Sequence, residues 1–142
     1  MEPTMVAIRD VMTREPQAVA KETSLSDVSR VMLDHDIGEV LVESGSKLCG
    51  LVTDRDIVVR AIAAGQDPER TAVDSICTHE LITLSPDDSV DDALQKMSRH
   101  AVRRLPVVQD GRAVGVVSLG DISATRDSGE TLEDISAAPP DN

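Results

Sequence analysis

Two short stretches of this sequence carry the same pattern of residue types, and each ends in an aspartate that follows a hydroxyl residue. Residues 50–57 read Gly-Leu-Val-Thr-Asp-Arg-Asp-Ile, and residues 115–122 read Gly-Val-Val-Ser-Leu-Gly-Asp-Ile. In both, the pattern predicts a buried strand that leads into a helix. Backbone N–H groups at such a turn attract anions. The hydroxyl can donate a hydrogen bond there, and the carboxylate can accept two from a vicinal diol such as a ribose.

The candidate binding residues of these turns are Thr53, Asp56, Ser118 and Asp121. An aspartate in the first turn of a helix also complements the helix dipole, which is worth about 0.3–1 kcal/mol. The dipole alone does not require a hydroxyl three residues earlier in both copies. We therefore interpret the pattern as ligand geometry.

The two stretches belong to a longer internal duplication. The second begins 65 positions after the first (115 − 50 = 65), and residues 9–61 align with residues 74–126 without a gap. Each copy predicts a β-α-β-β-α unit, so the fold class is α/β (α+β). Because a unit of about 60 residues has a marginal core alone, we expect the two to pack sheet against sheet about a pseudo-twofold axis. This packing would place the equivalent turns around a shared cleft.

Apolar periodicity and turn residues predict the elements of both copies. In the first copy we expect an extended segment at 15–20, a helix capped by Thr23 or Ser24, strands at 37–42 and 47–52, and a helix at 54–64. In the second copy we expect a short strand at 81–84, a helix that includes Val90 and Met97, strands at 104–108 and 113–117, and a helix from Asp121. Asp110-Gly111 predicts a hairpin turn.

These elements predict the domain boundaries. Repeat 1 covers residues 8–65, a polar linker covers 66–72, and repeat 2 covers 73–126. Residues 127–142 are acidic and end close to a Pro-Pro pair, which is typical of a disordered tail.

Composition excludes several classes of function. Of the 142 residues, 40% are hydrophobic and none is aromatic, and the net charge is −12. Nucleic-acid binding needs a basic face and usually aromatic platforms, so none is expected. The sequence has no apolar run of about 18 residues, so we expect no membrane span. The N-terminus does not resemble a signal peptide. We expect a cytoplasmic protein in which Cys49 and Cys77 are reduced, although a disulfide between them stays open.

The duplicated turns, residues 9–13 (Arg-Asp-Val-Met-Thr) and residues 104–108 (Arg-Leu-Pro-Val-Val) resemble the CBS domain family, and the pair resembles a Bateman module. Residues 34–38 and 51–58 strengthen the likeness to stand-alone CBS proteins of actinobacteria. The resemblance implies an adenosyl ligand (AMP, ADP, ATP or S-adenosylmethionine) in the cleft between the repeats. It also implies that modules pair into a flat disc.

The resemblance assigns roles to particular residues. Asp56 and Asp121 match the ribose-binding aspartates, with Thr53 and Ser118 beside them. The remaining implied contacts are to adenine and to phosphate, from Ala18, Val19, Thr83, Leu84, Arg103, Arg104 and Pro106. In repeat 1 the positions equivalent to Arg103 and Arg104 are Gly38 and Glu39. Since Glu39 would repel a phosphate, we expect one competent nucleotide site, or a second site for a less anionic ligand.

Metal binding and catalysis have weaker support in the sequence. Asp54 and Asp56 offer too few oxygens for a hard cation. His79 lies close to Cys77 in the sequence, but two ligands do not make a zinc site. Cys77 has no general base that the sequence can position. We therefore expect no metal site, no catalytic residue and no required cofactor.

The sequence predicts a regulatory or sensor module that binds an adenosyl ligand and acts on a regulated protein partner. The alternative is a stress-response protein that acts through protein contacts with an empty cleft, which Glu39 and the acidic surface favour. In both cases we expect a homodimer. The helix that starts near Asp56 is apolar nearly all round, through Ile57, Val58, Ala61 and Ile62.

Overall fold

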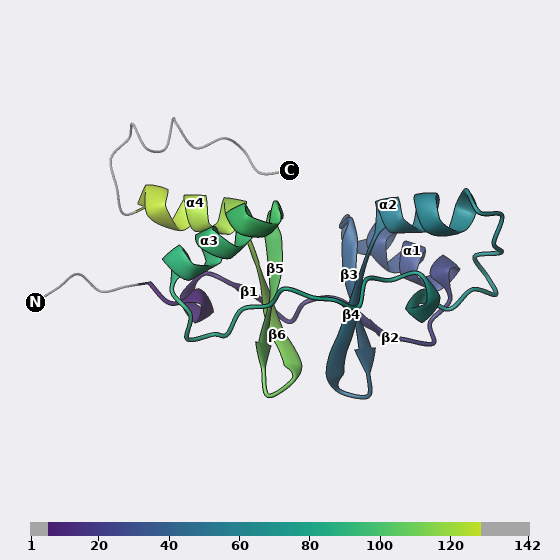
Figure 1. The fold of residues 1–142 in the computed structure, drawn as a ribbon, viewed down its shortest axis with the longest axis horizontal. Coiled ribbons are helices and arrows are strands. Elements are labelled where there is room, and N and C mark those ends of the chain that lie inside the picture. Colours follow the sequence, from purple (N-terminus) through teal and green to yellow (C-terminus); the bar gives the residue numbers. More distant parts are fainter. Residues whose placement is uncertain (1–5, 129–142) are drawn as a thin grey trace, which may run out of the picture. The chain divides into compact units, whose positions relative to one another are not determined.

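The computed structural model describes residues 6–128, which fold into two compact units with mixed helix and strand content. Among the described residues, unit 1 combines residues 6–15 with residues 82–128, and unit 2 is Pro16–Leu81. Each unit contains one three-stranded sheet and its own apolar core (Figure 1). The α+β class expected from the sequence is confirmed.

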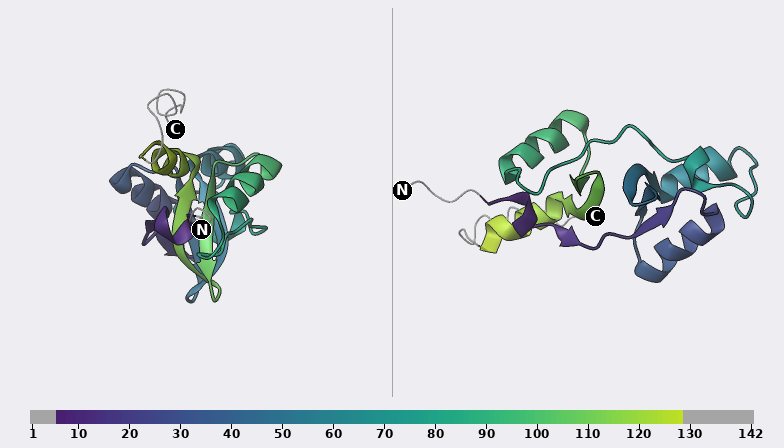
Figure 2. Two further views of the ribbon diagram at one scale, coloured as in Figure 1. Left: turned by 90° about the vertical axis from the view of Figure 1, so that its left-hand side faces the viewer. Right: turned by 90° about the horizontal axis from the view of Figure 1, so that it is seen from below.

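In unit 2 the sheet has the order β2-β3-β4, with β2 parallel and β4 antiparallel to β3. Helix α1 packs on β3, and β4 leads directly into α2 and a π-helix, η2 (Figure 2). The elements are β2 (Ala18–Ala20), α1 (Leu25–His35), β3 (Glu39–Ser44), β4 (Lys47–Thr53), α2 (Asp54–Asp56), η2 (Ile57–Ile62) and the 3₁₀ helix η3 (Val73–Ser75).

In unit 1 the sheet has the order β1-β6-β5, and α3 packs on β5 while α4 packs on β6 (Figure 1). The elements are the 3₁₀ helix η1 (Ile8–Asp10), β1 (Thr13–Arg14), α3 (Val90–His100), β5 (Arg104–Gln109), β6 (Arg112–Ser118) and α4 (Leu119–Ser128).

Local chemistry sets the ends of these elements. Ser24 caps α1 by accepting a hydrogen bond from the Asp27 N–H at 3.1 Å. Ser89 caps α3 in the same way through the Asp92 N–H. The hairpin turn expected at Asp110-Gly111 is confirmed, because both residues have positive φ (55° and 81°) between β5 and β6.

The compact units do not coincide with the sequence repeats. Thr13 and Arg14 pair with Val116 and Gly115 of β6, so the first strand of the chain completes the sheet of unit 1. Thr78 pairs with Leu51 of β4, so the start of the second repeat packs in unit 2. Each repeat therefore donates its N-terminal segment to the unit that contains the other repeat's hairpin.

Two glycines make room for these donated segments. A Cβ on Gly50 would lie 2.6 Å from the Cys77 sulfur, and a Cβ on Gly115 would lie 2.6 Å from the Met12 sulfur. Both distances are below van der Waals contact, so only glycine fits without a shift. These are equivalent positions in the two copies (50 + 65 = 115 and 12 + 65 = 77).

Three expectations need correction. The short strand expected at 81–84 is a single bridge from Leu84 to Val107. In unit 2 the Leu41 N–H bonds to the Gln17 carbonyl, but the equivalent of Leu41 is Pro106, which has no N–H to donate. The helix expected at 54–64 is divided into α2 and the π-helix η2.

The third correction concerns the C-terminal boundary. Helix α4 begins at Leu119, before the expected Asp121, and continues to Ser128, two residues into the segment expected to be a tail. Residues 129–142 of that predicted tail lie outside the described residues.

Candidate functional site

Thr53 and Asp56 bond to each other at the point where β4 becomes α2. The Asp56 N–H donates to the Thr53 hydroxyl oxygen at 3.0 Å, and the Thr53 N–H donates to Oδ2 of Asp56 at 3.0 Å. This reciprocal pair is a capping box, which satisfies two backbone donors at a helix start.

Ser118 and Asp121 repeat this geometry where β6 becomes α4. The Asp121 N–H donates to the Ser118 hydroxyl oxygen, and the Ser118 N–H donates to Oδ2 of Asp121, both at 3.0 Å. The capping box thus accounts for the hydroxyl at fixed spacing in both copies without a ligand, an explanation that our sequence argument did not consider because it weighed only the helix dipole. The cap also holds each carboxylate in one orientation, which suits a fixed ligand contact.

The two aspartates differ in their second oxygen. Oδ1 of Asp56 lies 3.7 Å from the Nε of Arg60, one helical turn later. The equivalent position on α4 is Thr125, whose hydroxyl donates to the backbone carbonyl of Asp121 at 3.0 Å. The carboxylate of Asp56 therefore has a cation four residues later, where the equivalent position after Asp121 carries a neutral threonine.

The strand residue opposite each hydroxyl also differs in charge. Glu39 pairs with Thr53 across β3 and β4, and Arg104 pairs with Ser118 across β5 and β6. Directly opposed residues in antiparallel strands project their side chains from the same face. The anion beside one turn and the cation beside the other make the two candidate sites electrostatically unequal.

The other predicted site residues lie around the same strands. Arg103 precedes β5, is exposed, and its carbonyl accepts from the Leu119 N–H at 2.8 Å. Leu84 is buried and bonds through its backbone to Pro106 and Val108. The Thr83 carbonyl accepts from Nζ of Lys96 at 2.8 Å.

The candidate residues divide between the units. Unit 2 holds Thr53 and Asp56 with the half-buried Ala18 and Val19 of β2. Unit 1 holds all the others: Thr83, Leu84, Arg103, Arg104, Pro106, Ser118 and Asp121. The fold thus brings each hydroxyl–aspartate turn into one unit with the first-strand residues predicted to accompany it.

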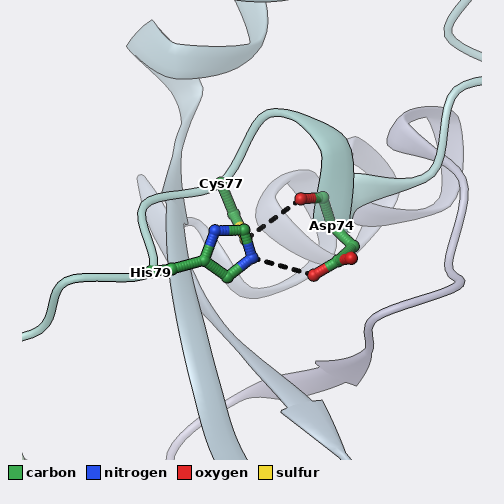
Figure 3. Close-up of side chains that lie close together, drawn as sticks. All are labelled: Asp74, Cys77 and His79. Atoms are coloured by element: carbon green, nitrogen blue, oxygen red, sulfur yellow. Dashed lines mark hydrogen bonds and ion pairs between the residues drawn. The ribbon is translucent and has the colours of Figure 1, made fainter.

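Asp74, Cys77 and His79 form a cluster that our sequence analysis missed (Figure 3). Nε2 of His79 lies 2.9 Å from Oδ1 of Asp74 and 3.4 Å from Sγ of Cys77. The sequence signal was the spacing of three potential ligands within six residues, of which we considered only Cys77 and His79.

This cluster is not a catalytic triad. In a triad, one imidazole nitrogen faces the nucleophile and the other faces the acid, whereas here Nε2 faces both. Burial, and after it the nearby Asp74 carboxylate, raise the pKa of the Cys77 thiol to about 11. A neutral thiol is a poor nucleophile.

Within residues 6–128, no helix combines the length and the apolar character that crossing a membrane requires.

Comparison with known proteins defines the class. A family model of the CBS domain matches residues 8–62 and 73–126. The CBS domain-containing protein YhcV of Bacillus subtilis is 35% identical over 127 residues, which cover 89% of this chain and 90% of YhcV. Hypoxic response protein 1 of Mycobacterium tuberculosis is 32% identical over 120 residues, 84% of each chain.

Two solved structures extend the comparison. The crystal structure of Hypoxic Response Protein I with two coordinated zinc ions matches with a TM-score of 0.78 and 32% identity, over 85% of this chain and 99% of that one. The CBS domain pair of MJ0100, in complex with 5-methylthioadenosine and S-adenosyl-L-methionine, matches with a TM-score of 0.76 and 26% identity. That match covers 89% of this chain and all of the other (100%).

Two α+β units that each carry a hydroxyl–aspartate turn define a tandem module. This chain belongs to the CBS domain family and contains two CBS domains in tandem.

Proposed function

We propose that this chain is a regulatory or sensor module, without catalytic activity of its own, that binds an adenosyl ligand at its hydroxyl–aspartate turns. The observation that carries the proposal is the second turn, where the fixed carboxylate of Asp121 lies three residues after Ser118 and Arg104 lies opposite Ser118. A carboxylate suits the ribose hydroxyls, and a guanidinium suits a phosphate. The complex of the MJ0100 pair with methylthioadenosine and S-adenosylmethionine supports the ligand class.

We further propose that the turn of repeat 2 supports nucleotide binding and that the turn of repeat 1 does not. Glu39 repels phosphate beside Thr53, and Arg60 competes with a ligand for the Asp56 carboxylate. A cationic ligand such as S-adenosylmethionine is less affected by Glu39 than AMP, ADP or ATP is.

Thermal unfolding in the presence of each ligand tests the proposal. A ligand at about 100 times its Kd stabilises the fold that binds it by about 2.7 kcal/mol. We expect AMP, ADP, ATP or S-adenosylmethionine to raise the Tm of the wild-type chain in a concentration-dependent way. If all four leave the Tm unchanged at millimolar concentration, the proposal is wrong.

A second candidate is a stress-response module that acts through protein contacts with no bound nucleotide. The capping boxes favour it, because they give both aspartates a structural role without a ligand. This second function would be supported if none of the four ligands changes the Tm of the chain and the chain captures a partner protein in a pull-down experiment.

We also propose a homodimer that covers the π-helix η2. Val58, Val59 and Ile62 are exposed by 58%, 50% and 48% on this helix. Light scattering that gives the mass of one chain at micromolar concentration would contradict the dimer.

A further inference from the structure

The cluster of Asp74, Cys77 and His79 brings a carboxylate oxygen, a thiol sulfur and an imidazole nitrogen close together, all within 4.8 Å of one another. In Figure 3 the three side chains point toward one another, Asp74 from η3 and Cys77 and His79 from the short segment that follows it. Cys77 is buried, Asp74 is half-buried and His79 is exposed, so the cluster opens to solvent on one side.

Hydrogen bonds join the three residues: the Cys77 thiol donates to the backbone carbonyl of Asp74 at 3.8 Å, and Nε2 of His79 lies near both Oδ1 of Asp74 and the Cys77 sulfur. A neutral imidazole with its proton on Nε2 can donate that proton to Asp74 or to Cys77, but both neighbours approach the same nitrogen. Three atoms that each carry a lone pair and converge in this way match the environment of a cation.

One of the separations already fits a tetrahedral ion, and the three ligand atoms lie within 4.8 Å of one another. Zinc bonds of about 2.3 Å to sulfur and about 2.0–2.2 Å to nitrogen and oxygen place tetrahedral ligands roughly 3.4–3.6 Å apart. The sulfur–nitrogen separation is 3.4 Å, and the nitrogen–oxygen separation of 2.9 Å needs a small rotation of two side chains that are not buried. We propose that Asp74, Cys77 and His79 bind one Zn²⁺ ion, with water in the fourth position.

The backbone supports this site on both sides. Thr78 exchanges two hydrogen bonds of 2.9 Å with Leu51 of β4, which fixes the residue between Cys77 and His79. Successive side chains of an extended segment alternate in direction, so Cys77 and His79 lie on the same side. The Cys77 N–H also bonds to the Val73 carbonyl at 3.0 Å.

The duplication provides an internal comparison. The positions equivalent to Asp74, Cys77 and His79 are occupied by Arg9, Met12 and Arg14. The 3₁₀ helix and its hydrogen bonds are the same in both copies, but Arg9 forms an ion pair with Asp87 and the arginines offer no ligand atoms. The proposal therefore predicts one ion per chain, independent of any nucleotide.

Zinc and cobalt titrations of the full chain, reduced, chelator-treated and without a histidine tag, test this site. Competition with a chromophoric chelator gives the stoichiometry and the affinity, and Co²⁺ gives a charge-transfer band if the Cys77 thiolate binds. We expect one equivalent, a thiolate–cobalt band, and a loss of affinity of at least about tenfold in His79→Gln and Asp74→Asn. Cys77→Ser should lose the cobalt band.

His100→Gln and Cys49→Ser are the matched controls, and both should bind zinc as the wild type does. His79 is exposed, so His79→Gln is expected to fold even if the buried Cys77→Ser variant does not. Equal zinc affinity in wild type and His79→Gln, or a Co²⁺ complex without the thiolate band, would overturn the proposal.

Discussion

Thr53 and Asp56 are joined by two hydrogen bonds of 3.0 Å, each from the backbone of one residue to the side chain of the other. The residues that are predicted to bind a ligand therefore also cap the N-terminus of a helix. A loss of binding after substitution is informative only when the folding effect is measured separately.

The first prediction concerns this structural role. Thr53→Ala should lower the free energy of unfolding by about 1 kcal/mol without any ligand, because the cap acceptor is lost. Thr53→Ser keeps the hydroxyl and should cost clearly less. Urea denaturation of the three proteins measures both effects, and equal stability of Thr53→Ala and wild type would contradict the cap.

The second prediction concerns the charge beside each turn. Arg104→Gln should weaken AMP binding by about tenfold or more, since hydrogen bonds to charged groups contribute about 1.5–3 kcal/mol. Glu39→Gln is the matched change in repeat 1, and it should leave AMP affinity unchanged or increase it. The reverse order of the two affinities would show that repeat 1 holds the nucleotide.

The third prediction uses the two glycines that contact the donated segments. Gly50→Ala and Gly115→Ala should each destabilise by about 1–3 kcal/mol through crowding. Adding Cys77→Ala to Gly50→Ala removes the sulfur 2.6 Å away and should recover part of this loss. Adding Met12→Ala to Gly115→Ala should recover less, because the Thr13 carbonyl oxygen still lies 2.9 Å from the new Cβ. Double-mutant cycles measure the difference, and equal recovery would contradict these contacts.

The fourth prediction concerns the Cys77 thiol in chelator-treated protein. Its pKa is raised to about 11, mainly by burial and to a smaller extent by Asp74. The thiol of an unfolded chain has a pKa of about 8.5. The unfolded chain therefore releases this proton first as pH rises, and the free energy of unfolding should decrease between about pH 8.5 and 11. In Cys49→Ser the Cys77 thiol should react slowly with iodoacetamide at pH 8. A rate equal to that of an unfolded peptide would contradict the raised pKa.

Much of the fold follows from the sequence because its determinants are local. The serine cap of α1, the Asp110-Gly111 turn and both hairpins depend on residues close together in the chain. The exchange of N-terminal segments was not predicted, because it depends on which hairpin accepts Thr13 and Thr78. The loss of the 81–84 strand depends on the N–H that Pro106 lacks, which only the strand register reveals.

The candidate site was predictable in its residues but not in its details. The duplication located Asp56 and Asp121, while their capping bonds and the contact of Asp56 with Arg60 required coordinates. The Asp74 cluster was missed because a 3₁₀ helix at Val73–Ser75 places Asp74 beside His79, five positions away in the sequence.

Isothermal titration of the wild-type chain and of the matched variants Asp121→Asn and Asp56→Asn tests the central claim most directly. Asparagine can still accept the capping hydrogen bond, so the two variants isolate the effect of the carboxylate charge on binding. We predict saturable heat for at least one of AMP, ADP, ATP and S-adenosylmethionine, an affinity at least about tenfold weaker in Asp121→Asn, and little change in Asp56→Asn. An absence of heat from all four ligands at millimolar concentration, or unchanged affinity in Asp121→Asn, would contradict the account.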